Sequence, residues 1–258
     1  MSGYAWFAFF WIFLIALGAL EHLFSEPATE EPRWRRWPAN LGLGLVNGAI
    51  ASLLPVTTIW AAKWAHDRGI GVLNVSVAPL WLAAVSTLVL RSLAQYIFHR
   101  LAHSVPFLWA VHQVHHSDID LDASTALRFH PLERVATTLF LLPFVILTGM
   151  SPIVLLAYET VELLVGVVSH TSLRIPQRVE RAVRWVIVTP GLHRLHHSSD
   201  LREADTNYGA LFSFWDRAFG TYRQHPLRSG AKMSFGLASA PQHKSDFPAL
   251  LRMPWRET

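Results

Sequence analysis

The segment VSVAPLWLAAVSTLVLRSLAQYIFHRLAH, residues 75–103, begins as an apolar stretch and ends in two histidines. Its first part, residues 75–98, contains a single charged side chain, Arg91. A helix of about 20 apolar residues is long enough to cross the hydrocarbon core of a membrane. We therefore expect a membrane-spanning helix that runs directly into His99 and His103, with Arg91 extending its charged end to the nearby membrane surface.

Two further apolar stretches precede this segment. Residues 4–20 carry no charged side chain, and residues 41–62 form a second stretch that Pro55 interrupts. No Lys or Arg lies within residues 1–7, so we expect an uncleaved span and not a secretory signal peptide. Over the whole chain 52% of the residues are hydrophobic and 16% are charged. This balance suits an integral membrane protein better than a soluble enzyme.

A pair of shorter apolar stretches follows the histidine-rich middle of the chain. Residues 135–150 and 152–168 are separated by Gly149, Ser151 and Pro152, which form a helix-stop and turn signature. Each stretch is short for a full crossing. We therefore expect a tight re-entrant helical hairpin, which enters the membrane and returns to the side from which it came.

This arrangement places residues 99–134 and everything after the hairpin on one face of the membrane. The connector on that side, residues 25–38, has three Arg, whereas the opposite connector, residues 63–74, has one Lys and one Arg. From His170 onward, 13 Lys and Arg stand against 7 Asp and Glu. Basic loops stay in the cytoplasm, so we expect this face of the membrane to be cytoplasmic. Such a basic tail indicates a phosphate-facing membrane surface and no nucleic-acid partner.

The clearest motif is His-x-x-His-His, which occurs twice. Its six histidines are His112, His115, His116, His193, His196 and His197. Residues three and four apart lie on one face of a helix, so each motif can present two or three ring nitrogens to one point, as can His99 and His103. The chain has 14 His and no Cys, which excludes disulfides, iron–sulfur clusters and cysteine-ligated haem. The pattern predicts a metal site of imidazole nitrogens.

Eight clustered histidines exceed what one ion with four to six coordination positions accepts, so we expect two ions. Neutral imidazole suits iron, zinc, copper and nickel alike, and spacing alone does not choose among them. The signatures of zinc proteases, soluble di-iron bundles and serine hydrolases are missing from the sequence. No credible flavin or nicotinamide loop is present either. Electrons for any redox chemistry would therefore come from another protein.

The residues around these clusters resemble the three histidine boxes of the fatty acid hydroxylase and sterol desaturase superfamily. The boxes read HRLAH at 99–103, HQVHHS at 112–117 and HRLHHS at 193–198. The resemblance covers roughly residues 75–225. Its further motifs are FHPLE at 129–133, HTSLRIP at 170–176, WVIVTP at 185–190, and the stretch from NYG at 207–209 through WDR at 215–217 to FGTY at 219–222.

The resemblance implies a membrane-bound, non-haem di-iron enzyme that uses dioxygen to hydroxylate a C–H bond of a fatty acyl, sterol or related lipid. It also implies an external electron donor, either a ferredoxin-type protein or a b-type cytochrome with its reductase. The box histidines would hold the iron ions, and zinc could replace iron on overexpression. The implied ligands are His99, His103, His112, His115, His116, His193, His196 and His197. The family adds a histidine before the last box, for which His170 is the candidate, and the role of His130 stays open.

The other polar residues receive plainer interpretations. Glu162 lies eight residues before His170, near the same helical face, and could hydrogen-bond that ligand or simply join two helices. Solvated positions are expected for Asp118, Asp120 and Asp122. Arg100, Arg128 and Arg194 lie beside histidines and could orient carboxylates or an acidic electron donor, but a charged, solvated face is preferred for them. Membrane-interface anchors are expected for Trp34, Trp37, Trp60, Trp64 and Trp109. Structural or surface roles without metal are expected for His22, His66, His225 and His243.

Three alternative functions are weighed against the hydroxylase. A desaturase would use the same metals, and spacing does not distinguish the two reactions. A metal transporter or sensor would place its ligands along the spans, whereas these histidines gather at one face. A zinc hydrolase would need a general base, for which Glu133 and Glu162 are the candidates.

The sequence therefore predicts an all-α integral membrane bundle with a re-entrant hairpin and a cytoplasmic, histidine-rich cap. We expect a single domain over residues 1–258. It would comprise N-terminal spans at 1–74, the histidine-box catalytic region at 75–225 and a basic cytoplasmic tail at 226–258. The oligomeric state is open.

Overall fold

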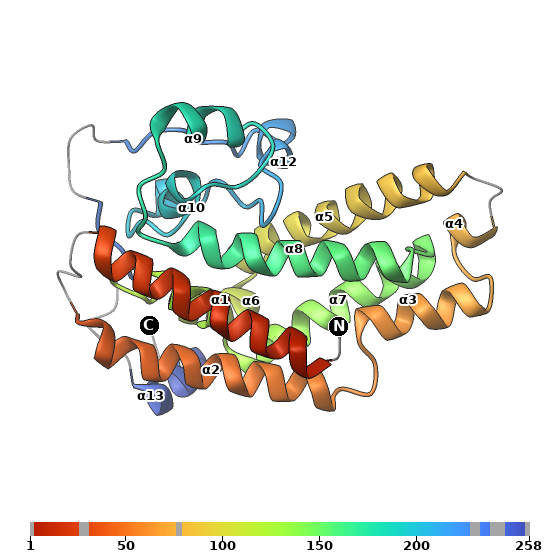
Figure 1. Ribbon diagram of the computed structural model, residues 1–258, viewed down its shortest axis with the longest axis horizontal. Coiled ribbons are helices and arrows are strands. Elements are labelled where there is room, and N and C mark those ends of the chain that lie inside the picture. Colours follow the sequence, from red (N-terminus) through yellow and green to blue (C-terminus); the bar gives the residue numbers. More distant parts are fainter. Residues whose placement is uncertain (1–2, 26–30, 76–78, 228–232, 238–245, 256–258) are drawn as a thin grey trace.

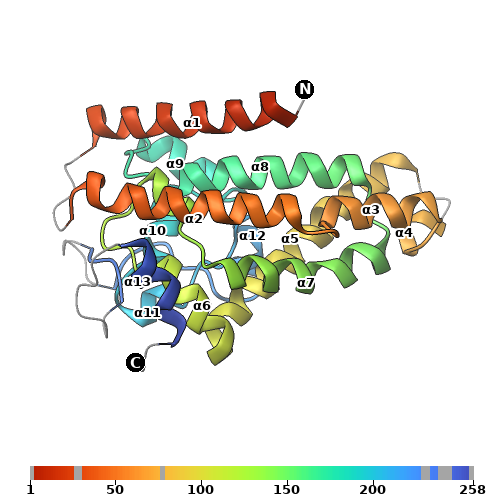
Figure 2. The ribbon, with the colours of Figure 1, turned by 90° about the horizontal axis from the view of Figure 1, so that it is seen from below.

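Long apolar helices form the body of the molecule (Figure 1). The computed structural model describes residues 3–25, 31–75, 79–227, 233–237 and 246–255. Among these, five helical segments are long and apolar enough to cross a membrane. Their principal helices are α1 (Gly3–Phe24), α2 (Arg33–Leu53), α5 (Leu80–Ser104), α7 (Pro131–Thr148) and α8 (Pro152–His170). Figure 2 shows α1 as an outer layer beside α2 and α8. The predicted all-α membrane architecture is confirmed.

The break predicted at Pro55 is present. Helix α2 ends at Leu53, and the chain resumes as α3 (Thr58–Asp67) and the short α4 (Val72–Val75). Thr57 caps α3, because its hydroxyl accepts the Trp60 N–H at 3.1 Å. The segment 33–75 therefore continues along the bundle as two helices that a turn separates. Helix α2 begins inside the connector predicted at 25–38, so the basic residues of that connector belong to a helix.

A turn joins α7 and α8 where the sequence predicts one, but both helices pack against α3 and α5 more than against each other. Gly149 ends α7 in a left-handed conformation with φ of 71°, which glycine adopts without strain. The tip lies against the chain after α3, where a Cβ atom on Gly71 would come within 2.3 Å of the Gly149 nitrogen. With 18 and 19 residues, the two helices are each about 27–29 Å long. How deeply the hairpin enters the membrane stays a prediction.

Short helices gather at the other end of the bundle, around the histidine-bearing ends of α5 and α8 (Figures 1 and 2). They form the cap of the molecule, and they are α6 (Pro106–His116), η1 (Ala123–Leu127), α9 (Gln177–Val183), α10 (Pro190–His196), α11 (Leu201–Ala204), α12 (Phe214–Ala218), α13 (Phe247–Arg252) and η2 (Met253–Trp255). The predicted tail at 226–258 includes α13, whose Leu250 is buried against Leu43 and Val114. Part of that tail is therefore packed core.

Buried charges fix the chain between α6 and η1 to helix α2. The Arg36 guanidinium donates to Asp118 at 2.9 Å and to Asp122 at 2.5 Å, and all three side chains are buried. Arg128 donates to the Val114 carbonyl at 3.0 Å and to Asn40 Oδ1 at 3.0 Å. The predicted solvated positions of Asp118, Asp122 and Arg128 are therefore wrong. The positive charges of the two arginines balance the negative charges of the two aspartates, and buried charges are tolerated when they are paired in this way.

A second ion cluster, in which a buried arginine meets two partly buried carboxylates, joins the long helices. Arg91 on α5 contacts Glu159 at 3.4 Å and Glu162 at 3.2 Å, both on α8. Thr58 on α3 donates to Glu159 at 2.9 Å, so the cluster joins three helices. The expectation that Arg91 extends to the membrane surface is wrong, because carboxylates inside the bundle satisfy its charge where it stands.

Candidate metal centre

Nine histidines converge in the cap as two adjacent groups. In each group one ring nitrogen per residue lies within 4.8 Å of the corresponding nitrogens of the others. The first group is His99, His103, His112, His116 and His196. The second group is His115, His170, His193 and His197. The structure thus brings together all eight box histidines and His170.

Neighbouring residues on one helix contribute to different groups. His115 and His116 end α6, and His115 belongs to the second group while His116 belongs to the first. His196 and His197 at the end of α10 divide in the same way. Successive side chains on a helix point about 100° apart. Each His-His pair therefore spans the boundary between the two groups.

Hydrogen bonds on the outer side of the rings orient the first group. His99 Nδ1 donates to the Tyr208 carbonyl at 2.7 Å, and His196 Nδ1 donates to the Thr206 carbonyl at 2.8 Å. A carbonyl oxygen can only accept, so the proton of each neutral ring is on Nδ1 and the Nε2 lone pair is free. This is the arrangement that metal-binding histidines adopt in proteins.

Carboxylates have the same role for two further members of the first group. His112 Nδ1 lies 2.7 Å from Glu133 Oε1, and His103 Nδ1 lies 3.1 Å from Asp205 Oδ1. Glu133 begins the hairpin in the first turn of α7, which ties the hairpin to the centre. It lies behind His112, on the side away from the converging nitrogens, so it is placed to orient that ring.

The second group is tighter. His170 Nδ1 donates to the Gly166 carbonyl at 2.6 Å, which leaves its Nε2 atom unprotonated. That Nε2 atom lies 3.1 Å from His115 Nε2 and 2.9 Å from His193 Nε2, and His193 Nε2 lies 3.2 Å from His197 Nε2. Two nitrogens that bind one ion at right angles are separated by about 3.0 Å when each metal–nitrogen bond is about 2.1 Å. The spacing therefore fits shared coordination of one ion.

The nitrogens of both groups also have the protonation state that a metal requires. Within the described residues, Nε2 of His99, His103, His112, His116 and His196 is buried without a hydrogen-bond partner. Burial, reinforced by neighbouring histidines, holds the pKa well below its ordinary value for His115, His116, His193, His196 and His197. These rings are therefore neutral near neutral pH, and neutral imidazole is the ligand form.

Two residues singled out in the sequence lie elsewhere. His130 caps α7, because its Nδ1 accepts the Leu132 N–H at 3.2 Å and its Nε2 donates to the Leu251 carbonyl. Both of its ring nitrogens are thus engaged away from the two groups. Glu162 pairs with Arg91 and accepts from the Tyr158 hydroxyl at 2.7 Å, so its suggested contact with His170 is not present.

Other expectations about the surroundings also change. The Trp109 ring, expected at the membrane interface, packs 5.1 Å from the His103 ring. Trp37, expected there too, donates its indole N–H to Asp122 at 3.0 Å. Of the isolated histidines, His66 contacts Asn74 and lies outside both groups. His243 lies outside the described residues.

The groups that orient the histidines were not identified from the sequence as orienting groups. Glu133 lies in the FHPLE motif, and that motif is the signal that could have found it. Tyr208 lies in the NYG motif, which is a signal of the same kind; its carbonyl accepts from His99, and its ring packs 5.8 Å from the His99 ring. Asp216 holds the backbone there by accepting the N–H groups of Tyr208 and Gly209 at 2.7 and 2.9 Å.

Comparison with known proteins agrees with this geometry. Residues 84–221, more than half of the chain, match the family described as fatty acid hydroxylase. The chain belongs to the fatty acid hydroxylase family. This confirms the resemblance seen in the histidine boxes, and the matched region contains both histidine groups.

Named relatives in this family match over the same part of the chain. Alkylglycerol monooxygenase of Xenopus tropicalis is 35% identical over 127 residues, which is 49% of this chain and 27% of the relative. Ornithine lipid hydroxylase OlsE of Rhizobium tropici is 33% identical over 152 residues, 58% and 45% of the two chains. Cholesterol 25-hydroxylase of Homo sapiens is 28% identical over 138 residues, which is 53% of this chain and 49% of the relative. The matched regions thus span between about a quarter and half of these relatives, and no solved structure matches.

Proposed function

We propose that this chain is a membrane-bound lipid hydroxylase whose nine clustered histidines hold two iron ions. One observation carries the proposal. In a member of the fatty acid hydroxylase family, buried neutral imidazoles converge as two adjacent groups. The names of the relatives support hydroxylation of a lipid, because they include a hydroxylase of ornithine lipid and one of cholesterol.

The overall reaction inserts one atom of dioxygen into a C–H bond and reduces the other atom to water, with two electrons and two protons. Bound iron would supply the reductive activation of dioxygen, and a ferredoxin-type or b-type cytochrome partner would supply the electrons. The residues of this chain prepare the site. Glu133 and the backbone carbonyls of Tyr208 and Thr206 keep the ring protons on Nδ1, and the surrounding cap buries the nitrogens from water.

The alternatives have less support. A transporter would need ligands along the spans, whereas the histidines are clustered at one end of the bundle (Figure 1). A zinc hydrolase would need a free carboxylate as its general base. Glu162 instead pairs with Arg91, and Glu133 orients His112. Neither carboxylate is then placed as a general base. A desaturase remains as an outcome of the first experiment below.

The first prediction concerns the product. Cells that express the chain, compared with cells that do not, are expected to accumulate a lipid heavier by one oxygen atom, detected by mass spectrometry of total lipid extracts. Expression of a His196→Ala variant should give no such lipid, because it removes a ring nitrogen from the first group. A loss of two hydrogen atoms would instead identify a desaturase, and an unchanged lipid profile would contradict both oxidation reactions.

We further propose that the cap faces the cytoplasm of a bacterial inner membrane. The residues that end α3 lie at the opposite end of the bundle from the cap (Figure 1). The chain has no Cys, so single cysteines can be labelled without background. Exposed positions are available at Arg202 in the cap and at Arg68 after α3.

The second prediction tests this orientation. An Arg202→Cys variant in intact spheroplasts should resist a membrane-impermeant thiol reagent and react after lysis, because its side would be cytoplasmic. An Arg68→Cys variant should react before lysis. The reverse pattern would place the cap outside the cytoplasm. Labelling of both positions before lysis would contradict a bundle that crosses the membrane between them.

A further inference from the structure

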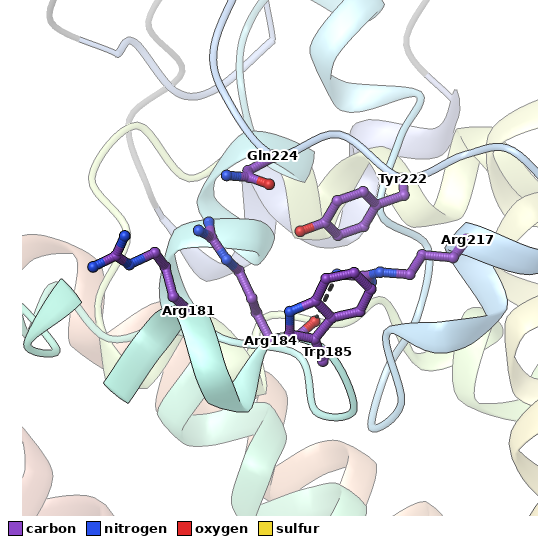
Figure 3. A pocket seen from close by; sticks show the side chains of 6 residues that line it. All are labelled: Arg181, Arg184, Trp185, Arg217, Tyr222 and Gln224. Carbon is purple, nitrogen blue, oxygen red and sulfur yellow. Dashed lines mark hydrogen bonds between the residues drawn. The ribbon is translucent and has the colours of Figure 1, made fainter. Parts of the chain in front are cut away.

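A cavity lined by none of the nine clustered histidines lies at the flank of the cap, between α9, α12 and the chain that follows α12 (Figure 3). Three arginines, two aromatic residues and an amide line it. They are Arg181, Arg184, Trp185, Arg217, Tyr222 and Gln224. Such a concentration of cationic donors makes the cavity a candidate site for an anion.

The Arg217 side chain lines one side of the cavity, and its contacts hold it in position. Its guanidinium lies 4.6 Å from the centre of the Trp185 ring and 3.6 Å from that of Tyr222. It also donates to the Ser213 carbonyl at 3.3 Å. A further bond to the Arg184 carbonyl, at 3.1 Å, is drawn in Figure 3. The aromatic contacts and backbone acceptors hold this arginine in place.

Other donors in the cavity remain available. Within the part of the chain that the structure describes, no carboxylate is paired with the side chain of Arg181 or Arg184. The nearest acidic neighbour in sequence, Glu180, accepts from the Thr189 hydroxyl at 3.2 Å. The Tyr222 hydroxyl is buried without a hydrogen-bond partner among the described residues. A buried hydroxyl of this kind calls for a partner that an oxyanion would supply.

The cavity lies alongside the spanning helices and not beyond their ends. Trp215 on α12 donates its indole N–H to Ser92 on α5 at 3.0 Å, and the Phe212 ring lies 6.3 Å from that of Tyr158 on α8. Ser92 and Tyr158 each stand twelve residues before the last residue of their helix, which is about 18 Å along the axis. This flank of the cap therefore lies beside the middle turns of α5 and α8.

The surface around the cavity is suited to a lipid bilayer. Apolar side chains are exposed there in spite of the surrounding arginines: Val179, Val183, Trp185, Val186 and Phe219. Trp185 is 65% exposed, and tryptophan prefers the headgroup level of membranes. Basic residues beside exposed apolar ones are typical of surfaces that lie on anionic membranes.

We propose that this cavity binds the phosphate of an anionic phospholipid and thereby seats the flank of the cap on the membrane surface. Arg181 and Arg184 would donate to the phosphate oxygens together with the Tyr222 hydroxyl, while the acyl chains would cover the exposed apolar side chains. A phospholipid is favoured over a soluble anion because only a lipid satisfies both the cationic cavity and its apolar surroundings. The proposal goes beyond the hydroxylase function and does not depend on bound metal.

The test is native mass spectrometry of the purified full-length chain in neutral detergent, titrated with phosphatidylglycerol or phosphatidylcholine. An Arg181→Gln/Arg184→Gln double variant is expected to bind phosphatidylglycerol about tenfold more weakly or worse, because it loses charge-assisted hydrogen bonds. The matched control is Arg202→Gln/Arg252→Gln, which removes the same charge from exposed positions elsewhere in the cap and should bind as the wild type does. Unchanged metal content would show that the double variant is folded.

Several results would overturn the proposal. Equal weakening in both double variants would mean unspecific charge attraction, and equal binding of phosphatidylcholine would mean that the anionic charge is not recognised. Displacement of phosphatidylglycerol by an equal concentration of inorganic phosphate would identify a soluble-anion site. If the Arg181→Gln/Arg184→Gln variant kept phosphatidylglycerol but lost binding to an acidic ferredoxin, the cavity would belong to a protein partner.

Discussion

A His116→Ala variant is expected to lose one of the two metal ions and all detectable hydroxylation, while a His115→Ala variant loses the other ion. The two residues are adjacent on α6, but His116 belongs to the first histidine group and His115 to the second. Metal analysis of protein from iron-replete cells should find about two ions per chain in the wild type, about one in each single variant and almost none in the double variant.

The control for this series is His225→Ala, which changes an exposed histidine outside both groups. It should keep the metal content and activity of the wild type. One ion or none per chain in the wild type would contradict the two-metal proposal. If His225→Ala lost as much metal as His116→Ala, cluster membership would not be what determines metal binding.

An Arg36→Met variant is expected to unfold the cap. The change leaves the buried Asp118 and Asp122 with fewer cationic partners, and removing one member of a buried charge network costs about 3–5 kcal/mol. Burial alone would raise the pKa of Asp118, but Arg36 and Arg128 outweigh burial and lower it. Without Arg36 this carboxylate becomes much more costly to keep ionised. The free energy of unfolding in detergent, followed by tryptophan fluorescence, measures the effect.

Two further variants serve as controls for the Arg36→Met result. Arg35→Met changes the exposed neighbour of Arg36 and should leave the stability nearly unchanged. Arg36→Lys keeps the charge but not the forked donor, so an intermediate loss is expected. If Arg36→Met were as stable as Arg35→Met, the buried ion network would not be holding the cap to α2.

The sequence was sufficient to predict that the box histidines converge, because helical spacing is local information. Histidines four residues apart stay in one group, whereas those three apart, His112 with His115 and His193 with His196, divide between the two groups. His170 lies outside that periodicity and was identified only through a resemblance. The turn between α7 and α8 was predictable for the same local reason, since Gly149 and Pro152 mark it.

The errors concern partners that are distant in sequence. Asp118 was expected to be solvated, but the Arg36 that compensates its charge lies 82 residues away. Glu162 has the correct spacing to face His170, but Arg91, 71 residues away, takes it instead. Helical periodicity gives the direction of a side chain and not the partner that a neighbouring helix presents to it. Charges inside an apolar helix are therefore better interpreted in pairs.

The two His-His pairs, His115 with His116 and His196 with His197, have a consequence for how the centre responds to motion. Each pair reaches both histidine groups from consecutive residues, so covalent bonds of the backbone limit how far the groups can separate. A shift of α6 against α10 would displace a ligand of each group together. The distance between two bound ions would therefore stay nearly constant when the membrane around the bundle changes its thickness or composition.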